Sequence, residues 1–116
     1  MKLDKELKEK VGTTQYQSPE QLLGKSYNEK VDIFAIGLIL LELCLYFTTN
    51  HEKQVTFQQI HQKTFNFKSL GDEFSNEQKL IEKMTQTDAS LRPSANEILN
   101  SEDYKALSRT YKSNDA

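Results

Sequence analysis

Apolar residues are concentrated in one part of this chain, since they fill thirteen of the fifteen positions in residues 33–47. They occur on every side of a 3.6-residue repeat, which is typical of a helix that is buried all round or lies in a membrane. A membrane span needs about 18 or more apolar residues, whereas this run is shorter and contains Glu42. The pattern therefore predicts one long buried helix, over residues 28–47, and no membrane partner.

Shorter helices are predicted on either side of this run. Residues 26–29, S-Y-N-E, have the form of a capping box in front of the long helix, and a cap-like S-N-E-Q stands at residues 75–78. Helical patterns with start signals cover residues 55–65, 75–84, 94–99 and 102–111. Loops are expected at residues 11–19, 48–53, 66–75 and 86–93, and no long alternating stretch suggests a strand. The sequence predicts an all-α fold.

Composition narrows the possible partners. The 116 residues suit one small domain, and 15 Lys+Arg against 17 Asp+Glu give a net charge of -2. This balance argues against nucleic acid or an anionic membrane as a partner. The charged residues 1–10 cannot form the apolar core of a signal peptide, so we expect a cytoplasmic protein.

Cysteine and histidine give no sign of a metal site or of redox chemistry. Cys44 is the single cysteine and stands among leucines, where a small core hydrophobe is the better interpretation. His51 and His61 have no carboxylate or cysteine at ligand spacing. We therefore expect both histidines on the surface or partly packed, and no bound metal.

Three segments carry a family resemblance. Residues 12–20 read G-T-T-Q-Y-Q-S-P-E, which resembles the G-T-x-x-Y-x-[AS]-P-E sequence that closes the activation segment of protein kinases. Residues 32–37, D-I-F-A-I-G, are similar to the D-x-[WF]-[SA]-x-G sequence that opens the long buried helix of the kinase C-terminal lobe. Residues 92–99, R-P-S-A-N-E-I-L, resemble the R-P-[ST]-A-x-E-[IL]-L ending. Together they imply the C-terminal half of a kinase C-lobe, with helices packed around one long hydrophobic helix.

The resemblance implies structural roles for several residues. Ser18, Pro19 and Glu20 would pin the chain after the activation loop, because proline fixes one backbone angle. Glu20 would form a buried ion pair with Arg92, the arginine of the R-P motif; two solvated charges are the alternative. Asp32 would accept hydrogen bonds from the catalytic loop, or else is simply an acid in a first helical turn.

Gly37 and the loop residues carry further expectations. Glycine inside a helix costs about 1 kcal/mol relative to alanine, so a close backbone approach is expected at Gly37. Thr13 and Tyr16 resemble the loop that receives the substrate residue after the phosphorylated one, and Thr13 has the serine/threonine-kinase form. They are ordinary polar loop residues if the rest of the site is missing.

Residues 18–43 look most like the kinases that phosphorylate the alpha subunit of eukaryotic initiation factor 2, with another serine/threonine kinase as the alternative. In that family the helix after the long buried one docks the protein substrate, which corresponds to residues 55–64 here. The resemblance therefore implies a protein partner for this region.

The motifs that perform phosphoryl transfer are not in this sequence. Kinases use a glycine-rich loop, a lysine–glutamate pair, a catalytic aspartate and metal-binding Asn and Asp, but the chain has no G-x-G-x-x-G, V-A-I-K, H-R-D or D-F-G. We expect no catalytic residue here and no bound cofactor, with ATP and Mg²⁺ belonging to the complete domain. The chain is then an inactive kinase fragment; a non-catalytic kinase-like binding module and an unrelated helical bundle are the alternatives.

These expectations divide the chain into three parts. Residues 1–10 form a charged segment, either a remnant of the activation loop or an artefact of truncation; residues 11–107 form a partial kinase domain; and residues 108–116 form a polar tail. Because the long helix belongs to a larger lobe, one of its faces should be bare. An exposed apolar patch of several hundred Å² and self-association through it are expected.

Overall fold

Helices form all the regular structure between residues 13 and 115, the part of the chain that this computed structural model describes, with side chains described for residues 15–109. The α-helices are α2 (Pro19–Leu22), α3 (Lys30–Cys44), α4 (Asn50–Gln62), α5 (Ser75–Met84), α6 (Ala95–Leu99) and α7 (Glu102–Asp115). Short 3-10 turns are η1 (Thr13–Tyr16), η2 (Phe67–Leu70), η3 (Asp72–Phe74) and η4 (Ala89–Leu91). No strand occurs within this range, so the predicted all-α class is confirmed.

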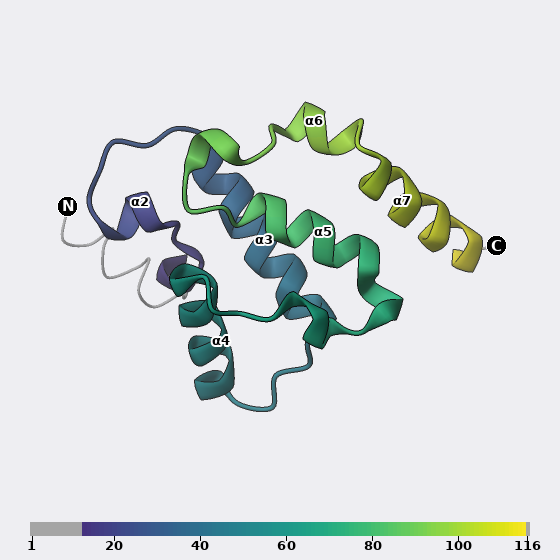
Figure 1. Ribbon diagram of the computed structural model, residues 1–116, viewed down its shortest axis with the longest axis horizontal. Helices are drawn as coiled ribbons and strands as arrows, with labels where there is room; N and C mark the ends of the chain where they lie inside the picture. The colour runs from purple at the N-terminus through teal and green to yellow at the C-terminus, as the bar shows by residue number, and fades with distance from the viewer. Residues whose placement is uncertain (1–12, 116) are drawn as a thin grey trace.

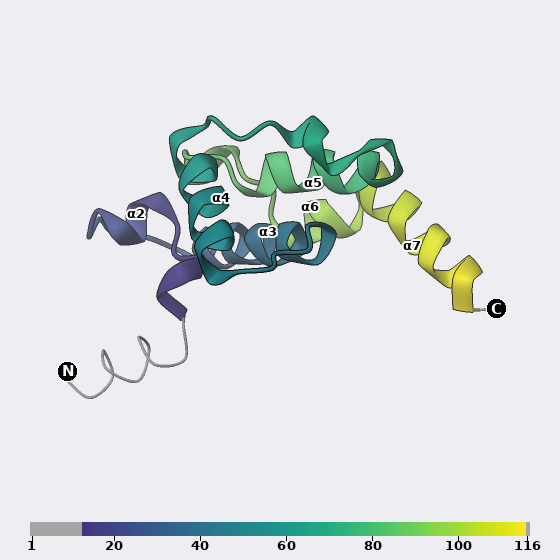
Figure 2. The ribbon, with the colours of Figure 1, turned by 90° about the horizontal axis from the view of Figure 1, so that it is seen from below.

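Helix α3 is the centre of the fold (Figure 1), and α5 lies along it. Phe34, Leu38 and Leu41 of α3 are completely buried and pack with Ile81 of α5. Helix α4 packs against the core of α3 through Phe57 and Ile60. Helix α7 contacts α5 and then extends away from the other helices (Figure 2). The apolar run therefore forms the central helix, as the sequence predicts.

The ends of α3 differ from the prediction. The helix begins at Lys30 and is capped by Glu29, whose side chain makes no capping hydrogen bond, so the predicted capping box at residues 26–29 is wrong. The Asn28 side chain instead accepts a hydrogen bond from the Lys30 N–H at 3.0 Å. At the other end Leu45 is extended, so the helix stops at Cys44 rather than near residue 47.

Capping geometry explains both ends of α4 and the start of α6, but not the start of α5. Helix α4 begins at Asn50, inside the predicted loop, because the Thr49 side chain accepts a hydrogen bond from the Glu52 N–H at 3.1 Å. It ends before left-handed Lys63, with φ of 60°. Ser75 lies inside α5 rather than capping it, so that predicted cap is wrong. The capping box predicted at Ser94 is present.

One face of α3 is exposed, so burial on all sides is wrong, and a bare apolar face is present instead. Ile36, Ile39 and Leu43 are 50%, 43% and 79% exposed. With residues of α5, α6 and α7 they line an apolar groove of about 500 Å³. Among residues 13–115, no helix combines the length and apolar character needed to cross a bilayer.

Candidate functional site

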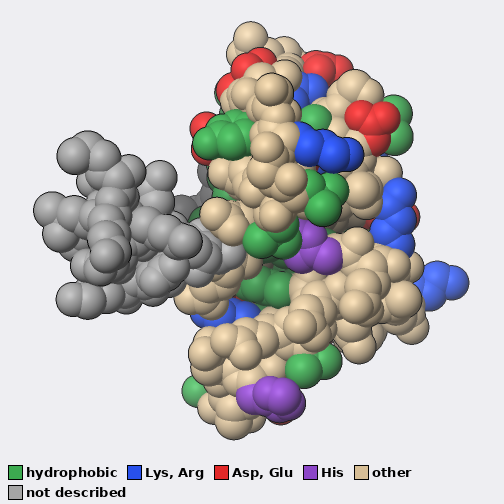
Figure 3. Space-filling model, turned by 90° about the vertical axis from the view of Figure 1, so that its left-hand side faces the viewer, with side chains coloured by type: hydrophobic (Ala, Val, Ile, Leu, Met, Phe, Trp, Pro, Cys, Tyr) green, Lys and Arg blue, Asp and Glu red, His purple; other side chains and the backbone are tan. Residues whose placement is uncertain are grey.

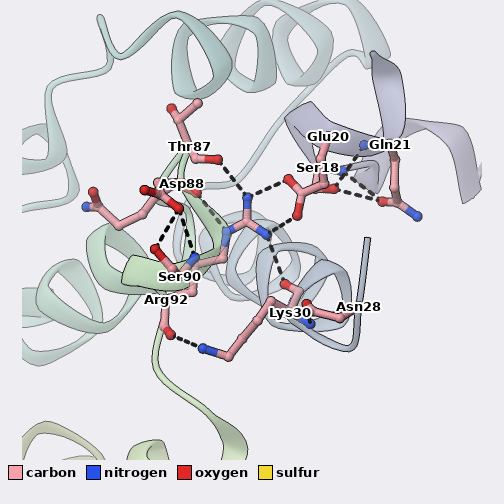
Figure 4. A network of polar contacts seen from close by, with 10 residues as sticks. Ser18, Glu20, Gln21, Asn28, Lys30, Thr87, Asp88, Ser90 and Arg92 are labelled. Carbon is pink, nitrogen blue, oxygen red and sulfur yellow. Dashed lines mark hydrogen bonds and ion pairs between the residues drawn. The ribbon is translucent and has the colours of Figure 1, made fainter. Parts of the chain in front are cut away.

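Glu20 and Arg92 lie at the centre of a buried polar network (Figure 4). The Arg92 Nη1 and Nη2 atoms each donate to one Glu20 carboxylate oxygen, both at 2.8 Å, so the pair is bidentate. The Arg92 side chain is completely buried and that of Glu20 is 13% exposed. The ion pair that the resemblance implies is therefore present across 72 positions of sequence.

Every N–H group of the Arg92 guanidinium has an acceptor. Besides Glu20, Arg92 donates to the backbone carbonyls of Gln86 at 2.7 Å, Lys30 at 3.1 Å and Thr87 at 3.2 Å. These five hydrogen bonds use all five donors, and the guanidinium carbon lies 4.9 Å from the Phe34 ring centroid. Hydrogen bonds from Arg92 lower the pKa of Glu20, although burial opposes this shift.

A capping box holds Glu20 in place. Ser18 is buried and accepts a hydrogen bond from the Gln21 N–H, while the Gln21 side chain accepts one from the Ser18 N–H at 2.9 Å. Pro19 occupies the first helical position, where its missing N–H costs nothing. Our sequence interpretation missed this box, although S-P-E-Q fits the S-x-x-Q capping pattern.

Tyr16 lies in a second polar cluster. Its hydroxyl donates to Glu42 Oε1 at 2.6 Å, and Lys53 Nζ donates to Glu42 Oε2 at 3.2 Å. The Tyr16 ring also packs on Phe57, with centroids 5.7 Å apart. Burial and the hydrogen bond to Glu42 raise the pKa of Tyr16. Glu42 and Lys53 were not identified from sequence, because no local pattern connects residues on separate helices.

Asp32 and Tyr16 line one groove, of about 330 Å³, between the segment around η1 and helix α3. Asp32 is exposed, and its side chain makes no hydrogen bond within the described part of the chain. The groove has room for further protein or ligand beside this acid. Thr13 lies in η1, and its side chain is outside the described residues.

Gly37 of α3 lies close to the C-terminal end of α5. A Cβ atom at this position would lie 2.8 Å from Thr85 Cγ2 and 3.0 Å from Met84 Cβ. The close approach expected from the sequence is therefore present.

Of the remaining titratable candidates, His61 and Cys44 are packed against the core, whereas His51 is exposed. His61 is half-buried and packs against Phe34, with ring centroids 5.1 Å apart and the ring planes tilted by 44°, and burial lowers its pKa. Burial, with a smaller contribution from Glu77, raises the pKa of the Cys44 thiol to about 11, so this thiol is protonated at neutral pH. No group of three or more metal-ligating side chains occurs among the described residues.

Surface charge is mixed on the face seen in Figure 3, where the basic side chains of the described residues are scattered between acidic and apolar ones. Nothing in that view resembles the continuous basic patch that binds nucleic acid.

Comparison with known proteins places these features in a family. The family model described as "Protein kinase domain" matches residues 1–103. The chain belongs to the protein kinase domain family. The paired Glu20 and Arg92 lie in two of the three segments from which the sequence predicted this membership.

Individual relatives point to one group within the family. The chain is 42% identical over 91 residues to the mouse interferon-induced, double-stranded RNA-activated protein kinase, covering 78% of this chain and 17% of that protein. It is 38% identical over 93 residues to rat eukaryotic translation initiation factor 2-alpha kinase 1, covering 80% and 15%. For the eIF-2-alpha kinase GCN2 of Schizosaccharomyces pombe the identity is 36% over 104 residues, covering 85% and 7%. The chain thus spans less than a fifth of each of these curated relatives, and their similarity confirms the resemblance to this group.

Proposed function

We propose that this chain is part of a serine/threonine protein kinase that, when complete, phosphorylates the alpha subunit of initiation factor 2. The observation that carries the proposal is the 36–42% identity with relatives that include kinases named for this substrate. Residues 11–107 form the partial catalytic domain in this proposal, residues 1–10 belong to the activation loop, and residues 108–116 are a tail. A cytoplasmic location is part of the same proposal.

The contribution of this chain to the kinase is to recognise the protein substrate. Tyr16 and Thr13 belong to the loop that receives the substrate residue after the phosphorylated one, and Tyr16 is fixed by Glu42. Helix α4 docks the substrate: only Phe57 and Ile60 of its thirteen residues are buried, so most of its surface is free for a partner. This geometry supports the substrate-recognising role that the family resemblance suggests for this part of the kinase.

Nucleotide chemistry belongs to the rest of the domain in this proposal. The chain carries no glycine-rich loop and no H-R-D or D-F-G motif, so we expect that the purified 116-residue chain neither binds Mg-ATP nor transfers phosphate. Thermal unfolding measured with and without saturating Mg-ATP tests this point. A ligand that binds only the folded state raises the melting temperature, so a clear rise would contradict it.

A chimeric kinase tests the substrate assignment directly. Residues 13–103 would replace the aligned segment of the mouse double-stranded RNA-activated kinase, and phosphate incorporation into initiation factor 2 alpha would be measured beside a generic serine/threonine substrate. We expect both proteins to be phosphorylated. A chimera that modifies only the generic substrate would show that the segment belongs to another serine/threonine kinase.

The second candidate function is a non-catalytic binding module that keeps the substrate-recognising half of a kinase. The free surface of α4 favours it as well, because such a helix can hold a partner without chemistry. The transcript upstream of residue 1 distinguishes the two: an open frame that encodes H-R-D and D-F-G supports the kinase, whereas stop codons throughout support the module.

Self-association of the isolated chain is proposed through the apolar groove. Ile36, Ile39 and Leu43 are exposed along it, and contiguous apolar surface of this kind marks interaction sites or aggregation. A second copy of the chain can cover this surface when the rest of the domain is not there to do so.

A further inference from the structure

Glu42 joins three separate elements through one carboxylate. Its Oε1 accepts a hydrogen bond from Tyr16 in η1 at 2.6 Å, and its Oε2 accepts one from Lys53 in α4 at 3.2 Å. Glu42 itself belongs to α3, the central helix of the fold. The contact therefore connects the substrate loop to the docking helix by way of α3.

Lys53 is held in this cluster rather than extended into solvent. Its side chain is only 15% exposed, against 56% for Lys83, which forms an ion pair with Asp103 at 3.1 Å elsewhere in the fold. Lys53 Nζ also lies 5.6 Å from the centroid of the Tyr16 ring, in reach of a cation–π contact. One ammonium group thus contacts Tyr16 directly and also through Glu42.

Few other contacts hold α4 against the body of the fold. Phe57 and Ile60 are its only buried side chains, with His61 half-buried beside them. Phe57 packs on Tyr16 with centroids 5.7 Å apart, so this contact also leads to the same loop residue. A shift of α4 at Lys53 would consequently also shift the Tyr16 side chain.

We propose that Lys53 is a positioning residue that couples the docking helix α4 to the substrate loop through Glu42 and Tyr16. This inference rests on the proposed function, because it takes η1 as part of the substrate loop. In its proposed role, Lys53 requires no contact with nucleotide or phosphate. It fixes the orientation of Tyr16, so a protein bound at α4 meets a loop that is already ordered.

Hydrogen exchange in the full 116-residue chain tests the coupling without any kinase activity. Lys53→Met should accelerate exchange of the Tyr16 and Gln17 amides by about five-fold, the loss expected for one partly buried ion pair. Lys53→Arg keeps the charge and should restore slow exchange. Lys83→Met is the matched control, since it breaks an ion pair of similar length between α5 and α7 and should leave these amides unchanged.

A double-mutant cycle shows whether Lys53 acts through this cluster. Tyr16→Phe removes the hydroxyl that donates a hydrogen bond to Glu42 but keeps the ring beside Lys53. In this background Lys53→Met should therefore accelerate exchange at residues 16–17 clearly less than in the original chain. The inference is overturned if Lys53→Met has the same effect in both backgrounds, or no more effect than Lys83→Met. Circular dichroism of each variant establishes that all are folded to the same extent.

The chimeric kinase separates this inference from the function on which it rests. There, Lys53→Met should raise KM for initiation factor 2 alpha and leave kcat unchanged, because the change acts on substrate positioning alone. If exchange at Tyr16 responds in the isolated chain but KM does not change in the chimera, the coupling stands and the substrate-loop assignment is wrong. If exchange does not respond, the coupling is wrong whatever the chimera does.

Discussion

At the residue scale, the largest cost of burial falls on the charged side chain of Arg92. Its guanidinium is removed from water completely, and its compensation comes from five hydrogen bonds and the Glu20 carboxylate. Three of those bonds go to backbone carbonyls on two different parts of the chain, near Lys30 and at residues 86–87. Arg92 therefore fixes the relative positions of α2, the start of α3 and the segment before α6.

Glu20→Gln should be strongly destabilising. The substitution leaves the buried cation of Arg92 without its counter-charge, and breaking a buried ion pair in this way typically costs about 3–5 kcal/mol. Urea unfolding followed by circular dichroism measures the loss. Glu82→Gln, which neutralises an exposed acid on α5, is the control and should change the free energy of unfolding by less than about 0.5 kcal/mol. Equal effects of the two variants would contradict a special role for the pair.

His61 should make the stability depend on pH. Burial lowers its pKa below the ordinary value of 6.5, and the nearby Arg92 cation adds to this effect, whereas a hydrogen bond with the backbone of Gln17 opposes it. The unfolded chain then binds the proton more readily, so stability is fully present above pH 6.5 and falls as the pH drops toward the lowered pKa.

The measurement is the free energy of unfolding in urea across this pH range. His61→Gln should flatten its dependence on pH, and His51→Gln, on the exposed start of α4, should leave the dependence unchanged. A slope that survives His61→Gln would assign the effect to other groups.

The residues that could be predicted from sequence are those with a local signal or a motif. Glu20 and Arg92 stand in recognisable motifs, and Gly37 is conspicuous inside an apolar helix. Glu42 and Lys53 were missed because their contact depends on how two helices and a loop pack. No spacing along the chain encodes that packing.

At the scale of elements, the long helix was predicted well and its ends were not. The apolar run continues past Cys44 because Leu45 and Phe47 still pack against the core, but as irregular chain rather than helix. Hydrophobicity reports burial in both cases, so it does not locate the helix end. Similarly, Ser75 resembles a cap, but the preceding turn η3 runs directly into α5 and leaves no capping position there.

Gly37→Ala should weaken the packing of α3 on α5. The new methyl group would lie 2.8 Å from Thr85 Cγ2 and 3.0 Å from Met84 Cβ, so the Thr85 side chain or the end of α5 must shift. Overpacking of this kind costs about 1–3 kcal/mol, which equals the gain of about 1 kcal/mol from replacing glycine in a helix at its lower end and exceeds it over the rest of the range. We expect a lower midpoint in urea.

Thr85→Ser tests whether contact with the Thr85 methyl group causes the loss of stability in Gly37→Ala. Serine lacks the methyl group nearest to the new Cβ but keeps the hydroxyl that donates to the Ile81 carbonyl at 2.7 Å. The double variant Gly37→Ala/Thr85→Ser should therefore recover part of the lost stability. No recovery would show that contact with Thr85 is not the reason for glycine at this position.

At the scale of the whole molecule, the described helices bury one side of α3 and leave the other open. The groove of about 500 Å³ beside Ile36, Ile39 and Leu43 runs along α3 toward α7. In the complete kinase proposed above, the rest of the domain would cover this groove. The sequence could predict that the central helix has a bare face, but the participation of α5, α6 and α7 in the groove required the fold.

Leu43→Glu should reduce self-association of the isolated chain. Leu43 is 79% exposed on the groove, so a charge there is solvated in the monomer but would be buried without a partner in an assembly that covers the groove. Sedimentation velocity over a range of protein concentrations should show association of the original chain and a monomer for this variant. Leu23→Glu introduces the same charge at a leucine that is 67% exposed near α2, outside the groove, and should leave association unchanged. If both variants became monomeric, net charge rather than the groove would control association, and if neither did, the contact would lie on another face.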